Sequence, residues 1–186
     1  MNLEKIESFI RKFPVYQYAF LSTEQVEFSD KMRLFCKRSC PHYGSSWSCP
    51  PATGKLDKCK EHCLRYTDLL LFSTVTEIPR TREKEKKAEA QIEHEKLTRL
   101  VNNHMRDLGY LTYVLSSSFC KNCSKCSFPK DYCRHPEEMM PCIESHGIVV
   151  ADLMEKCDMD YYMGERLQLM FSLIFFKDTG FIFSEK

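Results

Sequence analysis

The residues best suited to chemistry are four closely spaced cysteines in the second half of the chain. They follow the pattern C-x2-C-x2-C-x6-C, directly before an Arg-His-Pro sequence: Cys120, Cys123, Cys126 and Cys133. A 4Fe–4S cluster takes one thiolate per iron, and two-residue gaps let a tight loop reach neighbouring corners of the cubane. The wider last gap lets Cys133 return to the same cluster, although it leaves ligation of another cluster open. This run predicts an iron–sulfur site.

A zinc ion is the alternative occupant of this run. Structural zinc sites are commonly built from two separated C-x2-C pairs around one ion. Three cysteines packed as C-x2-C-x2-C suit a cubane better than a single tetrahedral ion. We therefore expect a 4Fe–4S cluster here and keep zinc as the alternative.

A second cysteine group lies in the first half, where Cys36, Cys40 and Cys49 have the spacing C-x3-C-x8-C. Its fourth ligand is ambiguous. Cys59 and Cys63 lie four residues apart on an expected helix and so share one face; either could complete a second cluster. Both could equally pack as small hydrophobic residues. Alternatively, one iron has no protein thiolate and is open to a substrate, as zinc is in catalytic sites.

Other residues near the two groups are less strongly indicated as parts of a metal site. We interpret Cys142 and Cys157 as packing residues on short helices, and Glu144 as a residue that could reach a cluster. Trp47 and Tyr43 are expected to shield the first cluster from water. Positive side chains flank both groups and could tune a cluster potential or attract an acidic redox partner: Arg33, Lys37, Arg38, Lys121, Lys125, Lys130 and Arg134.

The composition narrows the class of protein. The chain has 186 residues, a formal charge of +1 and eleven cysteines. This charge gives no sign of nucleic-acid binding, and residues 1–5 do not begin a signal peptide. We expect a cytoplasmic protein, where thiols stay reduced and metal binding explains the cysteines better than disulfides. The apolar run Leu167–Phe176 is about half the ~20 residues of a membrane helix, so we expect a buried strand and no membrane insertion.

Periodicity and breaker residues place the elements that would carry these cysteines. Strands are expected over 15–21, 66–75, 110–115 and 168–176, and helices over 3–12, 55–65, 80–108, 137–145 and 150–157. Residues 30–36 fit either a short helix or a strand. We expect one metal-binding domain over 1–186, with an α/β or α+β fold. Its cysteine loops, about 36–63 and 116–136, would lie at the edge of a sheet of about four strands.

The two cysteine stretches together resemble a known family. Cys40-Pro-His-Tyr-Gly-Ser-Ser-Trp-Ser-Cys-Pro-Pro51, followed by Cys120 through Pro136, resembles the "predicted metal-binding protein" family of anaerobic bacteria and archaea. The resemblance runs from about Cys36 to Gly147. It implies iron–sulfur or other metal binding in an anaerobic cytoplasm, with no known reaction.

The resemblance also implies a set of ligands. It carries ligand status to seven cysteines, namely Cys36, Cys40, Cys49, Cys120, Cys123, Cys126 and Cys133. The other candidates, Cys59 and Cys63, lie outside its pattern, and the position of Cys142 is a non-ligand. It therefore favours three thiolates at the first site.

Three functions fit the sequence. The first is electron transfer to a redox partner protein through one or two 4Fe–4S clusters. The second is an enzyme that binds a small-molecule substrate at an open iron held by Cys36, Cys40 and Cys49. The third is a zinc-stabilised structural or interaction module. The sequence indicates neither the substrate nor the oligomeric state.

Overall fold

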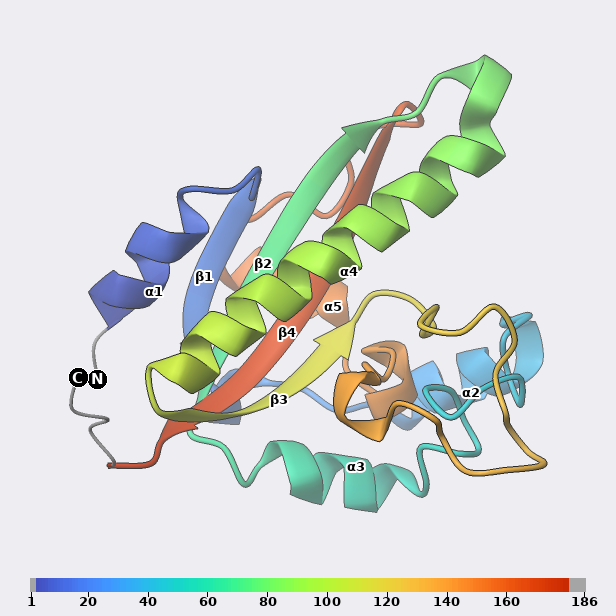
Figure 1. The fold of residues 1–186 in the computed structure, drawn as a ribbon, viewed down its shortest axis with the longest axis horizontal. Helices are drawn as coiled ribbons and strands as arrows, with labels where there is room; N and C mark the ends of the chain where they lie inside the picture. The colour runs from blue at the N-terminus through green and yellow to red at the C-terminus, as the bar shows by residue number, and fades with distance from the viewer. Residues whose placement is uncertain (1–2, 181–186) are drawn as a thin grey trace.

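The computed structural model describes residues 3–180 and is centred on a four-stranded sheet. Its strands are β1 (Gln17–Ser22), β2 (Asp68–Glu77), β3 (Tyr110–Ser116) and β4 (Leu167–Asp178). The strand order is β1-β2-β4-β3, and every neighbouring pair is antiparallel. The small mixed α and β fold is thus confirmed, and each strand boundary lies within two residues of its expected position (Figure 1).

The last strand is the most deeply buried. β4 pairs with both β2 and β3, and Leu173 to Phe176 are fully buried. A strand covered on both faces reads as a continuous apolar run, which explains why this segment resembles a short membrane helix in sequence. Among residues 3–180, no helix is long and apolar enough to cross a membrane.

Two helices cover one face of the sheet. α1 (Leu3–Ile10) and α4 (Glu83–Asp107) pack on side chains of β2 and β4, including Phe72 and Phe176. The apolar stripe of α4 makes this contact through Leu97, Val101 and Met105. The long charged helix therefore buries one narrow face and exposes the rest, as its periodicity predicts.

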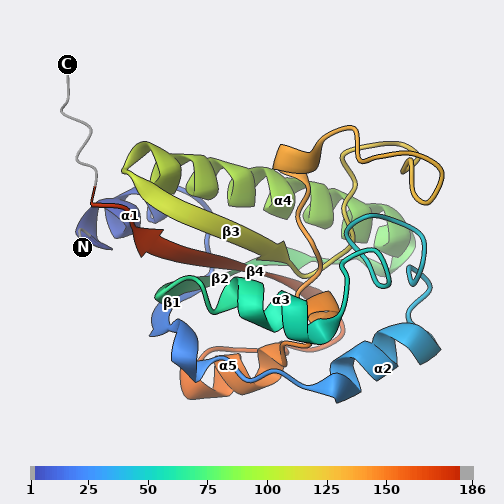
Figure 2. The ribbon, with the colours of Figure 1, turned by 90° about the horizontal axis from the view of Figure 1, so that it is seen from below.

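The opposite face is covered by α3 (Leu56–Cys63) and α5 (Val150–Lys156), so the molecule has three layers (Figure 2). The buried residues on this side include Leu71, Phe175 and Leu153. α2 (Asp30–Ser39) is a helix, which resolves the ambiguity over residues 30–36, and Ser29 caps its first turn.

The helix expected over 137–145 is wrong. This segment contains two separate 3-10 turns, η3 (Pro136–Glu138) and η4 (Glu144–His146). Between them the backbone bonds to distant segments: the Cys142 amide donates to the Ser48 carbonyl oxygen, and Ser116 pairs with Cys142 in an isolated bridge. These long-range bonds take the place of helical ones. The sequence also predicts a turn at Thr179 and Gly180 that leads into an apolar end, and this end lies outside the described residues.

Both cysteine loops lie at the same end of the sheet. The loop that begins after β3 carries the second run, and the loop after α2 carries Cys49 (Figure 1). β3 is an edge strand, so this placement agrees with the expected position at the sheet edge.

Candidate metal centre

The four cysteines of the second run line one cavity of about 490 Å³. Its wall also includes Ser46, Trp47 and Ser48 of the first loop. Each of the four cysteines is partly exposed. A larger cavity of about 580 Å³ lies around Arg80 and Tyr161 and has no cysteine in its lining. The cysteine-lined cavity is therefore the one suited to metal–sulfur chemistry.

Ser48 ties the two cysteine loops together. Its buried hydroxyl accepts a hydrogen bond from the Cys120 amide at 2.9 Å, and its carbonyl oxygen accepts one from the Cys142 amide at 3.2 Å. The same hydroxyl lies 3.9 Å from the sulfur of Cys49. One residue thus fixes the start of the second run beside a cysteine of the first group.

Aromatic contacts close the junction between the loops. The Trp47 indole N–H donates to the Asp131 carbonyl oxygen at 3.0 Å, and its ring meets Phe128 edge-on with centroids 5.1 Å apart. His42 stacks on Phe119 at 3.6 Å. Trp47 therefore packs against the loop of the second run, and its role as a shield of the first cluster stays a prediction. Tyr43 is 37% exposed and is not a core aromatic residue.

The first group is more deeply buried. Cys36 lies on α2 and Cys49 on the following loop, each only 4% exposed, while Cys40 caps the C-terminus of α2. Burial, followed by the nearby Cys40 and Glu144, raises the pKa of Cys36 to about 11. Burial also raises the pKa of Cys49, and this effect outweighs the hydrogen bonds from Ser46 and Ser48, which lower it. These thiols hold their protons at neutral pH, so metal binding there must release protons.

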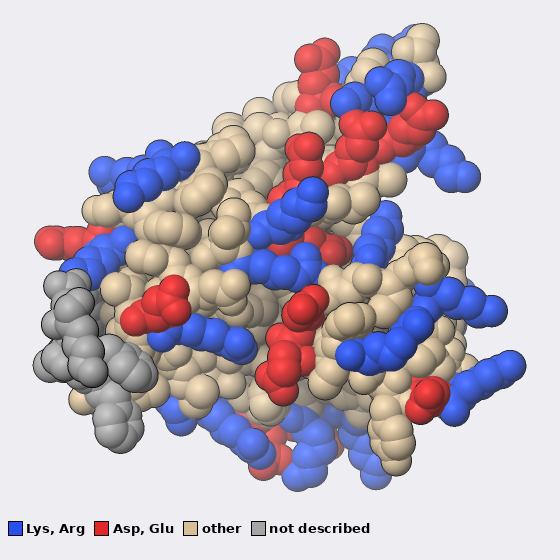
Figure 3. Space-filling view, viewed as in Figure 1, with Lys and Arg blue, Asp and Glu red and all other residues tan. Residues whose placement is uncertain are grey.

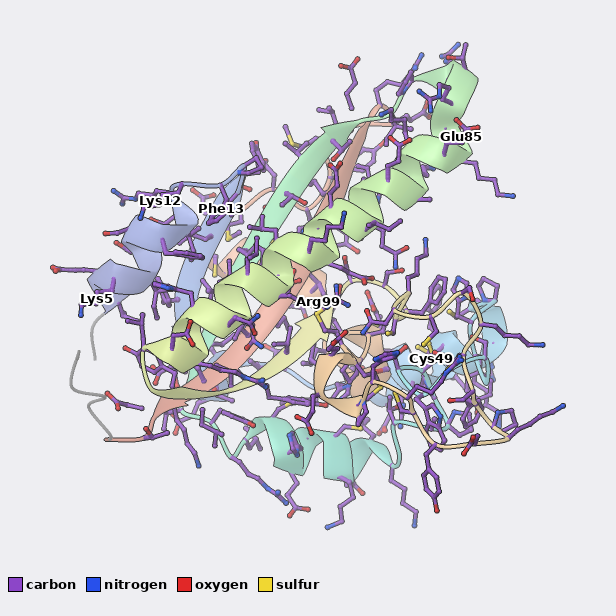
Figure 4. The ribbon with its side chains drawn as sticks, in the orientation of Figure 1. Lys5, Lys12, Phe13, Cys49, Glu85 and Arg99 are labelled. Atoms are coloured by element: carbon purple, nitrogen blue, oxygen red, sulfur yellow. The ribbon has the colours of Figure 1, made fainter. Side chains whose placement is uncertain are left out.

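The two groups meet at Cys49. Its pKa is also raised by the charges of Cys40, from its own group, and of Cys126, from the second run. Figure 4 shows Cys49 among the side chains of the two loops, below the point where α4 passes the end of β3. The structure therefore brings thiols from both halves of the chain into one region.

Within residues 3–180, no three His, Cys, Asp or Glu side chains converge on a point that could hold one metal ion. The four thiols of the second run line the wall of the cavity, and their number matches the four ligands of a zinc ion as well as the four thiolates of a 4Fe–4S cluster.

Cys59 and Cys63 are both buried on α3. The Cys59 thiol donates to the Thr53 carbonyl oxygen at 3.2 Å. Cys63 is fully buried in the core under β2, and burial raises its pKa. Cys36 and Cys49 are buried to a similar degree, so burial does not separate the packing interpretation of Cys59 and Cys63 from ligation.

Cys142 occupies a position that sequence reasoning did not foresee, whereas Glu144 lies near Cys36, in agreement with the expectation that it could reach a cluster. The Cys142 thiol donates to the Glu144 carboxylate at 2.6 Å. Both residues interact electrostatically with Cys36: Glu144 raises the pKa of Cys36, and Cys36 raises the pKa of Cys142. Burial is the largest cause of the raised pKa values of Cys142 and Glu144. The only signal in the sequence was the closeness of Cys142 and Glu144 to the second run. By contrast, Cys157 ends α5 and packs against the core.

The basic side chains around the second run take different positions. Lys125 and Lys130 are exposed. Arg134 donates to the Lys125 carbonyl oxygen, and Arg33 bonds Thr53, so these arginines also support the loops. In Figure 3, mostly Lys and Arg side chains project from the part of this face that lies over the cysteine loops.

One comparison with known proteins gives a match. A family model described as "Predicted metal-binding protein (DUF2284)" matches residues 19–176. This match is wider than the stretch from Cys36 to Gly147 that carries the resemblance in sequence. No curated protein and no solved structure matches the chain.

Proposed function

Because this chain belongs to the DUF2284 family of predicted metal-binding proteins, we propose that it is an iron–sulfur protein that transfers electrons. The observation that carries the proposal is the cavity lined by Cys120, Cys123, Cys126 and Cys133. The residues present fit a 4Fe–4S cluster, since its four irons take four thiolates and four thiols line this cavity. Such a cluster supplies reversible one-electron chemistry when bound.

The surroundings support a role in electron transfer. Cys49 and Cys126 are close enough for electrostatic interaction, so clusters in the two groups would be neighbours. The cysteines of the second run are partly exposed, which gives a partner access to that end of the molecule. The exposed Lys125 and Lys130 would attract an acidic surface. The proposed partner is an acidic redox protein in a reducing, anaerobic cytoplasm.

The proposed compartment is a reducing one, in which thiols such as the eleven free cysteines of this chain persist unpaired.

Anaerobic purification followed by iron and sulfide quantitation tests the proposal. Two 4Fe–4S clusters give about eight irons per chain, and one gives about four. Cys126→Ala should lose one cluster and its paramagnetic signal in the reduced protein. Cys157→Ala is the matched control, because Cys157 lies on α5 against the core, and it should keep full iron content. A colourless chain loaded with zinc would overturn the proposal in favour of a zinc module.

The second candidate is an enzyme with an open iron at the first group. It rests on the three cysteines of that group, Cys36, Cys40 and Cys49, which leave one iron of a cubane without a thiolate from the group. Addition of a small thiol would then perturb the spectrum of one cluster only. The number of thiolates at the first group decides between the two functions.

A further inference from the structure

We propose that Cys142 is the fourth thiolate of the first group, where it completes a cluster site with Cys36, Cys40 and Cys49. This inference rests on the proposed function and specifies one of its two sites. Three observations support it: how the backbone of Cys142 is held, what packs behind it, and where its sulfur lies.

The backbone of Cys142 is fixed beside the first group. Its amide donates to the carbonyl oxygen of Ser48, the residue directly before Cys49, at 3.2 Å. On each side of Cys142 the chain bonds to Ser116: the Ser116 amide donates to Pro141, and the Ile143 amide donates to Ser116, both at 2.9 Å. These bonds hold the residue between the end of β3 and the loop that carries Cys49.

The following turn holds the same segment against the helix that carries Cys36. η4 contacts both α2 and α3. The Ser29 amide, at the start of α2, donates to the Gly147 carbonyl oxygen at 2.6 Å. Gly147 has a φ of +75°, and a Cβ there would lie 2.6 Å from the Leu56 side chain. The glycine thus permits a close approach of this turn to Leu56 of α3 and to Ser29 at the start of α2, the helix that carries Cys36.

The sulfur of Cys142 has a polar neighbour that packing does not require. A cysteine that only fills space behaves as a small hydrophobic residue, yet the Cys142 thiol donates to the Glu144 carboxylate at 2.6 Å. Cys142 and Glu144 are only half-buried. The charge of Cys36 acts on Cys142, and that of Glu144 acts on Cys36, so all three groups share one region. The Cys142 thiol thus lies in a polar region that it shares with the first group, where it is available as a ligand, and is not sealed in the apolar core.

Ligation by Cys142 exchanges its S–H proton for an iron–sulfur bond and releases the proton to water, with no transfer of electrons. Four thiolates would then occupy all four irons of the first cluster. Such a site has no open iron for a substrate. The inference therefore favours electron transfer over the enzyme alternative.

The test compares Cys142→Ala with Cys157→Ala and Glu144→Gln in anaerobically prepared protein. We expect Cys142→Ala to lose iron and to lose or change one paramagnetic signal, while Cys157→Ala matches the wild type. Glu144→Gln should keep both clusters, because it leaves the sulfur in place. Far-ultraviolet circular dichroism checks that each variant is folded.

A second background keeps the test independent of the second run. In Cys126→Ala protein, only the cluster of the first group should remain, and adding Cys142→Ala should abolish or change its signal. An unchanged signal would overturn the assignment of Cys142 while leaving the iron–sulfur function intact. Loss of the cluster with Glu144→Gln but not with Cys142→Ala would instead make the carboxylate the ligand. Wild-type protein without iron would sink the proposed function itself.

Discussion

The two cysteine groups position their thiols by different structural routes. Cys120–Cys133 is a single loop of fourteen residues whose thiols are partly exposed around a cavity. The first group is assembled from α2 and the following loop, and Cys36 and Cys49 are each 4% exposed. The thiol positions of a ligand set within one loop depend little on the rest of the fold. In a set assembled from several segments, they depend on how those segments pack together. The second group is thus suited to meeting a partner, and the first to a protected internal position.

The largest expected effect concerns the sheet that both groups share. His94 on α4 is buried and hydrogen-bonds Thr74 and Ser172, and burial lowers its pKa to about 4. The folded-state pKa lies below the unfolded value near 6.5, so this stability is present above pH 6.5 and is lost as the pH falls toward 4. His94 should contribute up to about 3 kcal/mol of acid sensitivity.

Urea unfolding of the wild type and of His94→Leu at pH 7.5, 6 and 5 measures how much His94 contributes to the pH dependence of the unfolding free energy. The variant should lose about half of the pH slope, since His146, whose pKa burial also lowers to about 4, retains a similar share. His135→Gln is the control, because His135 is exposed in the second loop. Equal slopes in His94→Leu and the wild type would contradict the assignment.

Gly147→Ala should weaken metal binding at the first group more than at the second. The new Cβ would clash with the Leu56 side chain at 2.6 Å and lie 3.1 Å from the Ser29 carbonyl oxygen, at a positive φ. We expect a loss of about 2 kcal/mol in unfolding free energy and preferential loss of metal from the first group. Gly44→Ala is the matched control, since Gly44 has a φ of +70° with nothing within 4 Å of the added Cβ. It should cost about 1 kcal/mol. Equal metal loss from both groups in Gly147→Ala would count against the comparison.

Ser48→Ala should affect both groups at once. The substitution removes the hydroxyl that accepts from the Cys120 amide and lies beside the Cys49 sulfur. An unpaired, half-buried amide should cost about 1–2 kcal/mol, measured by chemical denaturation. Iron release to a chelator should become faster at both sites. The exposed Ser45, whose hydroxyl donates to His42, gives the control Ser45→Ala, with an expected change below about 0.5 kcal/mol.

Trp47→Phe should produce the smallest effect, confined to the second group. It removes the indole N–H that donates to Asp131 and preserves an aromatic ring against Phe128. The lost bond should cost about 1 kcal/mol, seen as faster iron release from the second cluster. Tyr43→Phe, on the same loop but more exposed, should leave the rate unchanged. Faster release from the first cluster alone would instead support the predicted role of Trp47 as its shield.

Local patterns predicted much of the fold. Alternating strands and helices were visible in the sequence, and the structure has them. The helix expected over 137–145 is wrong because the backbone of this segment bonds to Ser48 and Ser116, and no local pattern indicates those partners. The burial of His94 is equally invisible to local patterns, because His94 lies on a charged helix and yet bonds Ser172 of β4.

The sequence by itself determined that the four thiols of the second run line one cavity. They lie within fourteen residues of one loop, so they face a common space almost regardless of what surrounds them. The sequence also determined the elements, since periodicity and breakers act over a few residues. Tertiary structure alone decided that β4 enters between β2 and β3, that Ser48 joins the two loops, and that the Cys142 amide bonds to Ser48. These relations join residues far apart in the chain, and only the packing of the whole sheet selects among the many ways to pair them.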